Sequence, residues 1–361
     1  MPRLNFPTRA ARLPALVLAT VALWLLLLSC APPPGVGATG FPLAVFDAAQ
    51  DGGYFRSRAA LRAGTRLMAI PENFWPPPRE VIFAPEPIMA CPQHVLAWPQ
   101  MYWRDPRFEV FRWNRFPTLL IFDTADYDVQ DRMLKRIAFY VEKRGWRGRL
   151  AHDEEIADLH GWNAHDYRSV DLARFFQTAR EQDFPLSREE LELEQILLDE
   201  GLIWETLDGL VGGEGGILSI SREASEALRV LFMAHEGFHG LFFIDEDFRD
   251  FTAERWEAFP EDGRQMFLTF LDDQEYDIEV EFIVLKEFSA FLLQQPVAHA
   301  PFYFGIRMPY RISNREWHEA HRHMRNPNGM FPRFADIFTR EVEAFSAYVE
   351  YRWGFAAGRV W

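Results

Sequence analysis

Hydrophobic and polar positions predict strand and helix segments that alternate in the first half of the chain. Residues 118–122 (Thr-Leu-Leu-Ile-Phe) form a short apolar run typical of a buried strand. Helical spacing follows over residues 128–143, and Gly145 ends it. We expect a second strand and a short helix within residues 146–160. These segments predict a small α/β unit without the Gly-rich loop of dinucleotide-binding folds.

The second half of the chain has mainly helical periodicity. Ser187 and Glu190 form a capping box at the start of a helix that Gly201 ends. Four glycines within residues 212–216 mark a loop. Residues 217–220 are expected to form a short edge strand, which could hold an extended substrate by β-augmentation.

Two longer helices are predicted after this loop. Ser221 is expected to cap the first, which runs to about Phe243. The second extends from Gln274 to Gln295 and ends before Pro296, because a proline disfavours helical backbone in the residue before it. The predicted fold class is therefore α+β, with a small α/β domain followed by a mainly helical domain.

The first thirty residues have the pattern of an export signal. Three arginines precede a 16-residue apolar run, Leu13–Leu28, and Ser29-Cys30 follows directly. Leu27-Leu28-Ser29-Cys30 resembles the lipobox of bacterial lipoproteins. The resemblance implies that residues 1–29 are removed and that Cys30 carries lipid. An ordinary signal peptide or an uncleaved anchor is the alternative. No later run reaches 18 consecutive apolar residues, so no second membrane span is expected.

The length of 361 residues suggests two to three domains, at about 150 residues each. Residues 1–29 are the predicted signal peptide, and residues 30–70 the lipidated cysteine and its tether. Residues 71–185 are predicted to form an α/β domain with an irregular, aromatic-rich start, since three consecutive prolines at 76–78 exclude a helix there. Residues 186–361 are predicted to form the helical domain.

Composition limits the class of protein. Lysine and arginine number 38 against 53 aspartate and glutamate, a formal net charge of −15. A duplex nucleic-acid partner needs a basic face, so this balance argues against one. Hydrophobic residues make up 48% of the chain, which is enough for a packed core and excludes a disordered or collagen-like protein. If Cys30 carries lipid, Cys91 is the one remaining cysteine and no intrachain disulfide is expected.

His235-Glu236-Gly237-Phe238-His239 matches the pattern His-Glu-x-x-His. On a helix, residues four apart lie on one face, so both imidazoles can reach a single tetrahedral Zn²⁺. Glu236 stands beside them, where it can take a proton from a metal-bound water. The surrounding residues are apolar, and polar groups on such a helix need partners, which a metal ion supplies. A chance pair of core histidines is the alternative, and Gly237 lowers helix propensity.

These residues resemble the zincin metallopeptidases, over this helix and less securely to about residue 296. The resemblance implies a third ligand. The first candidate is Glu287, because Glu287-Phe288-Ser289-Ala290 is similar to the Glu-x-x-Ala pattern of gluzincin-like families. Helical spacing supports it independently, since Glu287 shares a face with a set of apolar residues. These are Val280, Ile283, Val284, Ala290 and Phe291. The alternative is that Glu287 pairs with an arginine.

Asp245 is a competing ligand. In metzincins the motif continues to a glycine and a further ligand, and Asp245 occupies the ligand position. Phe242, however, replaces the glycine that lets the chain turn back to the metal. A role for Asp245 that needs no such turn is to accept a hydrogen bond from a ligand histidine.

The resemblance implies a mechanism in which Zn²⁺ polarises a carbonyl and Glu236 acts as general base, then passes the proton to the leaving amine. A further donor would stabilise the oxyanion. The candidates are Tyr303, Arg307, Tyr310, His318, His321 and His323. His318 and His321 are more typical of a solvated helix end than of a second metal site. In a polar cluster at residues 160–167, His165 and Asp166 could contact substrate or take part in catalysis; a loop held by its own hydrogen bonds is the alternative.

The sequence therefore predicts an exported, lipid-anchored zinc metallohydrolase of the bacterial cell envelope, on its periplasmic or outer-surface side. A peptidase acting on peptide or protein substrates is the leading interpretation. The alternative is a non-catalytic surface lipoprotein, for binding or as a scaffold, with structural zinc or none, whose aromatic-rich residues 71–115 would bind the ligand. A catalytic zinc keeps an open position for water, whereas a structural zinc is closed by four protein ligands.

Overall fold

The computed structural model describes residues 86–361. The predicted signal peptide, Cys30, the tether and residues 71–85 lie outside the described residues. The predictions of export and lipidation therefore stay predictions.

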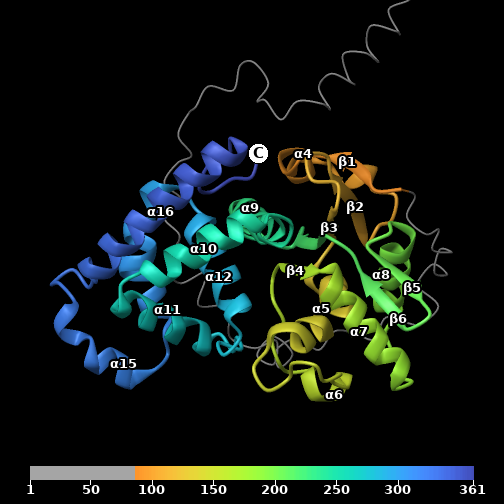
Figure 1. Ribbon diagram of the computed structural model, residues 1–361, viewed down its shortest axis with the longest axis horizontal. Helices are drawn as coiled ribbons and strands as arrows, with labels where there is room; N and C mark the ends of the chain where they lie inside the picture. Colours follow the sequence, from red (N-terminus) through yellow and green to blue (C-terminus); the bar gives the residue numbers. More distant parts are fainter. Residues whose placement is uncertain (1–85) are drawn as a thin grey trace, which may run out of the picture. The chain divides into compact units, whose positions relative to one another are not determined.

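A five-stranded mixed sheet forms the first half of the described chain (Figure 1). Its strands, in order across the sheet, are β1 (Ile88–Ala90), β2 (Phe108–Trp113), β3 (Leu119–Thr124), β7 (Gly216–Ser221) and β4 (His165–Arg168). The pairs β1–β2 and β3–β7 are parallel, and the pairs β2–β3 and β7–β4 are antiparallel. A separate hairpin consists of β5 (Ile203–Thr206) and β6 (Gly209–Gly212). The α+β class is confirmed.

The predicted strand at residues 118–122 is confirmed as β3, and its side chains alternate between two cores. Leu120 and Phe122 pack with α5 (Tyr127–Glu142), α7 (Ser169–Glu181) and α8 (Arg188–Asp199) on one face of the sheet. Leu119 and Ile121 join the second core, on the face that α9 (Glu226–Ile244) covers. Every residue of β3 is buried, as expected for a strand between two layers.

The prediction that residues 217–220 form an edge strand is wrong. They lie in β7, between β3 and β4, and all six residues of β7 are buried. Apolar runs of this length suit a strand buried on both faces, and the sequence did not reveal the partner that covers each side. With both edges hydrogen-bonded, β7 cannot accept a substrate strand by β-augmentation.

Several predicted helices are confirmed, with changed limits. Helix α5 matches residues 128–143, and the Ser187–Glu190 capping box starts α8. Residues 146–160 contain the short helix α6 (Asp153–Ile156) but no strand, because Gly145 and Gly148 both turn the chain at positive φ. The next strand after α5 is β4, which lies later in the chain than the predicted second strand.

The mainly helical region begins after β7, with α9, and not at residue 186 as predicted, because β7 belongs to the sheet. Ser225 caps α9, instead of the predicted Ser221, which is the last residue of β7. The predicted helix at 274–295 is shorter, since α11 ends at Asp273 and Glu275 adopts a left-handed φ of 67°. The other α-helices within residues 86–361 are α4 (Pro92–Ala97), α10 (Glu246–Ala258), α11 (Glu261–Asp273), α12 (Glu281–Leu293), α13 (Ala300–Phe302), α14 (Met308–Arg311), α15 (Arg315–Ala320) and α16 (Pro332–Trp353).

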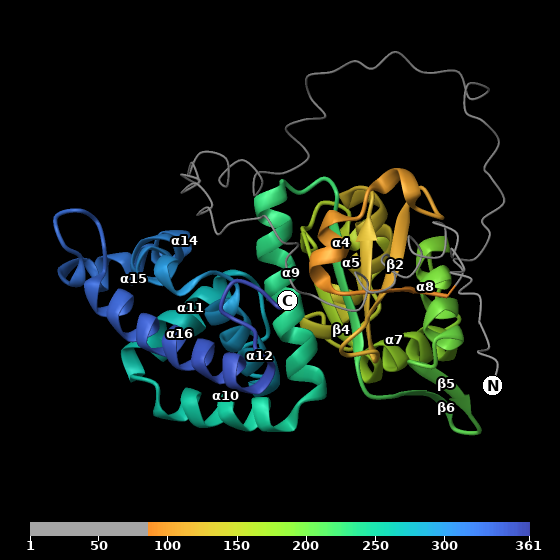
Figure 2. The same cartoon turned by 90° about the horizontal axis from the view of Figure 1, so that it is seen from above.

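Helix α9 lies between the sheet and the helical region, with β7 and β4 on one side and α12 on the other (Figure 2). Among residues 86–361, it alone is long and apolar enough to cross a membrane by length and composition. Most of its apolar stretch is buried inside the protein, and a core helix has the same character. The side chains of α9 therefore lie at the junction between the sheet and the helical region.

Candidate metal centre

The His-Glu-x-x-His residues lie in the middle of α9, as predicted. Ser225 Oγ accepts a hydrogen bond from the backbone N–H of Leu228 and so caps the helix. His235, Glu236 and His239 are all buried. Gly237 has a packing role, because a Cβ there would lie 2.7 Å from Val360 Cγ2 near the C-terminus. The glycine that weakens helix propensity thus allows the end of the chain to pack against α9.

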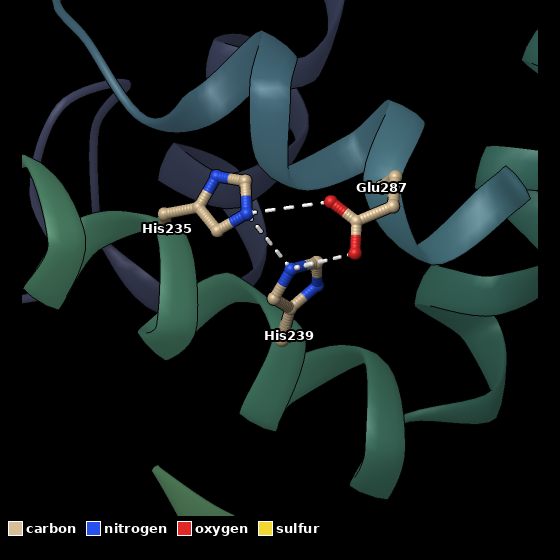
Figure 3. A group of neighbouring side chains, drawn as sticks. All are labelled: His235, His239 and Glu287. Carbon is tan, nitrogen blue, oxygen red and sulfur yellow. Dashed lines mark hydrogen bonds and ion pairs between the residues drawn. The ribbon is translucent and has the colours of Figure 1, made fainter. Parts of the chain in front are cut away.

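Glu287 on α12 meets the two histidines of α9 (Figure 3). His235 Nε2 lies 3.0 Å from His239 Nε2 and 3.4 Å from Glu287 Oε2. His239 Nε2 lies 3.5 Å from Glu287 Oε1. Two elements almost fifty residues apart in sequence thus bring together the predicted three ligands.

These separations fit a tetrahedral zinc ion. Ligand bonds of about 2.0–2.1 Å at tetrahedral angles place neighbouring ligand atoms about 3.3 Å apart. The three distances scatter around that value, and the contacts to the carboxylate are longer than charge-assisted hydrogen bonds of about 2.7–2.9 Å. Neither Glu287 oxygen has a hydrogen bond of good geometry with any described residue. Lys286 Nζ lies 3.4 Å from Glu287 Oε1, too long for a strong hydrogen bond. A buried carboxylate without a good hydrogen bond is costly, and a cation between the three ligand atoms would stabilise it.

Two further features suit metal binding. His235 Nδ1 lies 3.1 Å from Gln294 Oε1, an acceptor that orients the ring with Nε2 toward Glu287. Burial lowers the pKa of His239 to about 3, against an opposing effect of Glu287. His239 is therefore neutral at ordinary pH, the form in which an imidazole binds a metal.

An acidic layer with one lysine adjoins the three residues. Asp166 comes from β4, Glu142 from the end of α5 and Lys286 from α12. Lys286 Nζ donates to Asp166 Oδ2 at 2.8 Å and Oδ1 at 3.1 Å, and to Glu142 Oε2 at 3.1 Å. Asp166 Oδ1 lies 3.7 Å from His239 Nε2. Together with Glu236 and Glu287, four buried carboxyl groups gather around Lys286, while the buried Lys143 acts on Glu142 alone among them.

This charge imbalance shifts the titration of the acidic groups. Burial raises the pKa of Glu236 well above its ordinary value, and Asp166 and Glu287 add to the shift. Burial also raises the pKa of Asp166, which Lys286 offsets only in part. For Glu287, burial acts upward, but His239 and Lys286 outweigh it and hold the pKa well below its ordinary range. One more positive ion would relieve the excess of negative charge.

Asp166 is a candidate for substrate contact or catalysis in the sequence, with a loop held by its own hydrogen bonds as the alternative; the structure places it on the strand β4. It pairs with Leu218, which belongs to the core on the α9 side, so Asp166 points toward the histidines. His165 alternates to the opposite face, where its Nδ1 lies 2.7 Å from the Tyr167 hydroxyl. The strand separates the two residues, and only Asp166 reaches the cluster.

Asp245 is not brought to the histidines. Its side chain accepts a hydrogen bond from the backbone N–H of Phe248 and caps α10, and it forms an ion pair with Arg352. It is therefore neither a neighbour of the three ligand atoms nor an acceptor for a ligand histidine. The continued motif of metzincins does not describe this chain.

The predicted oxyanion donors separate in space. Tyr303 is buried beside Gln294 and Arg311, and burial raises its pKa. His318 and His321 contact the backbone carbonyls of Ile312 and Trp317 at 2.7 and 2.8 Å. Tyr310 is half exposed and His323 exposed. Tyr303 is thus the candidate that shares a contact, Gln294, with the His235 ring.

Glu142 and Lys286 were missed by sequence reasoning. Each stands next to a residue that attracted attention for its helix or ligand role, and neither belongs to a motif. A signal was present for Lys286, because it lies within the apolar run 282–293, where an unpaired ammonium would be costly.

The chain matches no protein-family model, and no curated protein or solved structure is similar to it at a significant level.

Proposed function

We propose that this chain is an exported zinc-dependent metallohydrolase, specifically a peptidase, held at the bacterial cell envelope by a lipid on Cys30. The observation that carries the proposal is the convergence of His235, His239 and Glu287 at ligand distances inside the protein. Two imidazoles and one carboxylate are a donor set that suits zinc in hydrolases.

The fourth position supports catalysis over a structural role. A structural zinc is closed by four protein ligands. Asp166 is close enough to His239 to serve as a fourth, but both of its oxygens accept hydrogen bonds from Lys286. If Asp166 stays paired with Lys286 when the metal binds, one coordination position is open for water or a substrate carbonyl.

The residues have distinct parts in the proposed reaction. A bound zinc supplies a Lewis acid that polarises the substrate carbonyl and lowers the pKa of water. His235, His239 and Glu287 hold the ion, and Gln294 orients the His235 ring. The Glu236 carboxylate accepts a proton from the attacking water and returns it to the leaving nitrogen. Its Oε2 has no hydrogen-bond partner among the described residues. The His235 side chain is 11% exposed and marks where the centre meets solvent.

The competing proposal is a non-catalytic surface lipoprotein with structural zinc or none. Its aromatic-rich region is described from residue 86, where Met101 and Tyr102 are exposed. No occupant of that surface follows from the structure. The two proposals differ in whether the centre hydrolyses a substrate.

Metal content of the purified full-length protein tests the centre first. Elemental mass spectrometry should find about one zinc per chain in the wild type and none in Glu287→Ala. Asp245→Ala is the matched control. It also removes a carboxylate, at the C-terminal end of α9 and 13% exposed, and this variant should keep its zinc. Loss of zinc in Asp245→Ala alone, or a folded wild type without metal, would refute the assigned ligands.

Hydrolysis of a peptide library tests the reaction. Glu236→Gln should keep the zinc but lose activity by roughly 10²–10⁴-fold, the usual contribution of a general base. Unchanged activity in this variant would exclude Glu236 as the base. Zinc binding without hydrolysis of any peptide would favour the non-catalytic alternative.

A further inference from the structure

The ammonium of Lys286 lies between three carboxylates that come from three different elements. Its Nζ is 2.8 Å from Asp166 Oδ2, 3.1 Å from Glu142 Oε2 and 3.4 Å from Glu287 Oε1. The lysine is 4% exposed and each of the three acids is buried. One oxygen from each acid lies within 4.8 Å of the others, close enough for a metal ion to bind all three.

Glu287 belongs to this group and also to the group of two histidines. Its Oε2 faces His235, while its Oε1 faces both His239 and Lys286. A carboxylate shared in this way between two cation positions is the arrangement of two-metal sites, in which the ions are about 3.5–4 Å apart. Here one of the two positions already contains a positive charge that is part of the chain.

We propose that Lys286 is a built-in cation that takes the place of a second metal ion and limits the centre to one. The inference rests on the proposed zinc site, because Glu287 is shared between the two positions. Among residues 86–361, the ion pairs of Lys286 Nζ are all with carboxylate oxygens, which suit a hard ion such as Mn²⁺ or Mg²⁺ rather than zinc.

A pocket connects this position to the surface. Its lining includes Glu142, Asp166 and Lys286, with Asp171 and the arginines 147, 168 and 174. A metal ion could therefore enter, and it is the ammonium that keeps the position from accepting one. The lysine also donates hydrogen bonds to both oxygens of Asp166, the neighbouring carboxylate that could otherwise bind the zinc ion, so one side chain bears on both the number of metals and the open coordination site.

Titration of zinc-loaded, full-length protein with Mn²⁺ tests the inference, with free Mn²⁺ followed by its paramagnetic resonance signal. Zinc binds such sites more tightly than Mn²⁺, so Mn²⁺ does not displace it. In Lys286→Met the side chain keeps its approximate length and loses its charge. We expect Mn²⁺ to bind this variant at least about 100-fold more tightly than the wild type, because a cation a few ångströms away no longer repels it.

Two controls separate the specific site from weak binding to the acidic surface. Lys286→Arg keeps the positive charge and should bind Mn²⁺ as weakly as the wild type. Lys286→Met combined with Glu142→Gln removes one oxygen ligand and should lose the tight Mn²⁺ binding while retaining zinc. Circular dichroism reports whether each variant is folded.

Tight Mn²⁺ binding by the zinc-loaded wild type or by Lys286→Arg would overturn the inference. Folded Lys286→Met that binds Mn²⁺ no better than the wild type would overturn it as well. If Lys286→Met does not fold, the wild type and Lys286→Arg still decide, since both must exclude a second ion. A wild type without zinc would refute the proposed function itself, and the zinc measurement reports that separately.

Discussion

The ion pair that anchors the start of α9 allows a quantitative test of how the metal helix is positioned. Asp123 on β3 is fully buried and accepts two hydrogen bonds from Arg229, at 2.7 and 3.0 Å. Arg222 pairs with the same carboxylate at 2.5 Å. The Arg229 side chain is 7% exposed and that of Arg222 is 19% exposed. The pair therefore fixes α9 to the sheet six residues before His235.

We expect Asp123→Ala to lower the free energy of unfolding by about 3–5 kcal/mol, because it leaves the Arg229 charge buried without a partner. For a unit of this size, that change corresponds to a fall in Tm of roughly 6–20 °C, at about 2–4 °C per kcal/mol. Arg222→Ala is the control. It removes a partner that keeps some contact with solvent, and should cost only about 1–2 kcal/mol.

The same geometry predicts that the intact pair contributes little net stability. Burial raises the pKa of Asp123, and the two arginines offset this only in part, so the ionised carboxylate remains costly to bury. The double variant Asp123→Leu/Arg229→Met should therefore be more stable than Asp123→Ala, by about 2 kcal/mol or more. Urea unfolding of all variants at one zinc concentration measures these differences. The reasoning fails if Asp123→Ala costs no more than Arg222→Ala, or if the double variant is as unstable as Asp123→Ala.

Two further predictions concern α9 itself. Burial and nearby carboxylates raise the pKa of Glu236, so the metal-free chain holds a proton on this carboxyl group at pH values below that pKa, and a bound dication expels the proton. The affinity for zinc should therefore rise with pH. Calorimetry should detect protons released on zinc binding, and fewer of them in Glu236→Gln. An affinity that does not change with pH would contradict this. In Gly237→Ala, the new methyl group would lie 2.7 Å from Val360 Cγ2, and overpacking of about 1–3 kcal/mol should exceed a helix-propensity gain of about 1 kcal/mol. The loss in urea unfolding should be up to about 2 kcal/mol, and should disappear when Val360→Ala is added; a penalty that persists would exclude the contact as its cause.

The elements that could be predicted from the sequence are those set by local patterns. The apolar run at residues 118–122 became β3, and the Ser187–Glu190 capping box started α8. The His-Glu-x-x-His spacing placed both histidines on one face of a helix. Glu287 was predictable because a carboxylate within an apolar helical stripe needs a buried partner.

Other parts of the fold depended on partners far away in the chain. Residues 217–220 were apolar enough for a strand, but their central position depends on β3 and β4 lying on either side. The sequence His165-Asp166-Tyr167-Arg168 has little strand character by itself. It forms β4 because β7 offers a hydrogen-bonding edge.

The sequence by itself determined the helix that carries the histidines and the α+β class, because these follow from interactions within a few turns of chain. It also identified the three candidate ligands, through the spacing of His235 and His239, the apolar helical stripe around Glu287 and the resemblance to gluzincin-like families. Only the tertiary structure decided that Glu142, Asp166 and Lys286 join them. Those residues come from the end of α5, from β4 and from α12. Asp166 was a candidate in the sequence, but nothing local joined it to the histidines, and Glu142 and Lys286 belong to no motif. Their proximity results from packing between the sheet, α9 and α12, and the strength of their interactions depends on burial, which local sequence patterns do not encode.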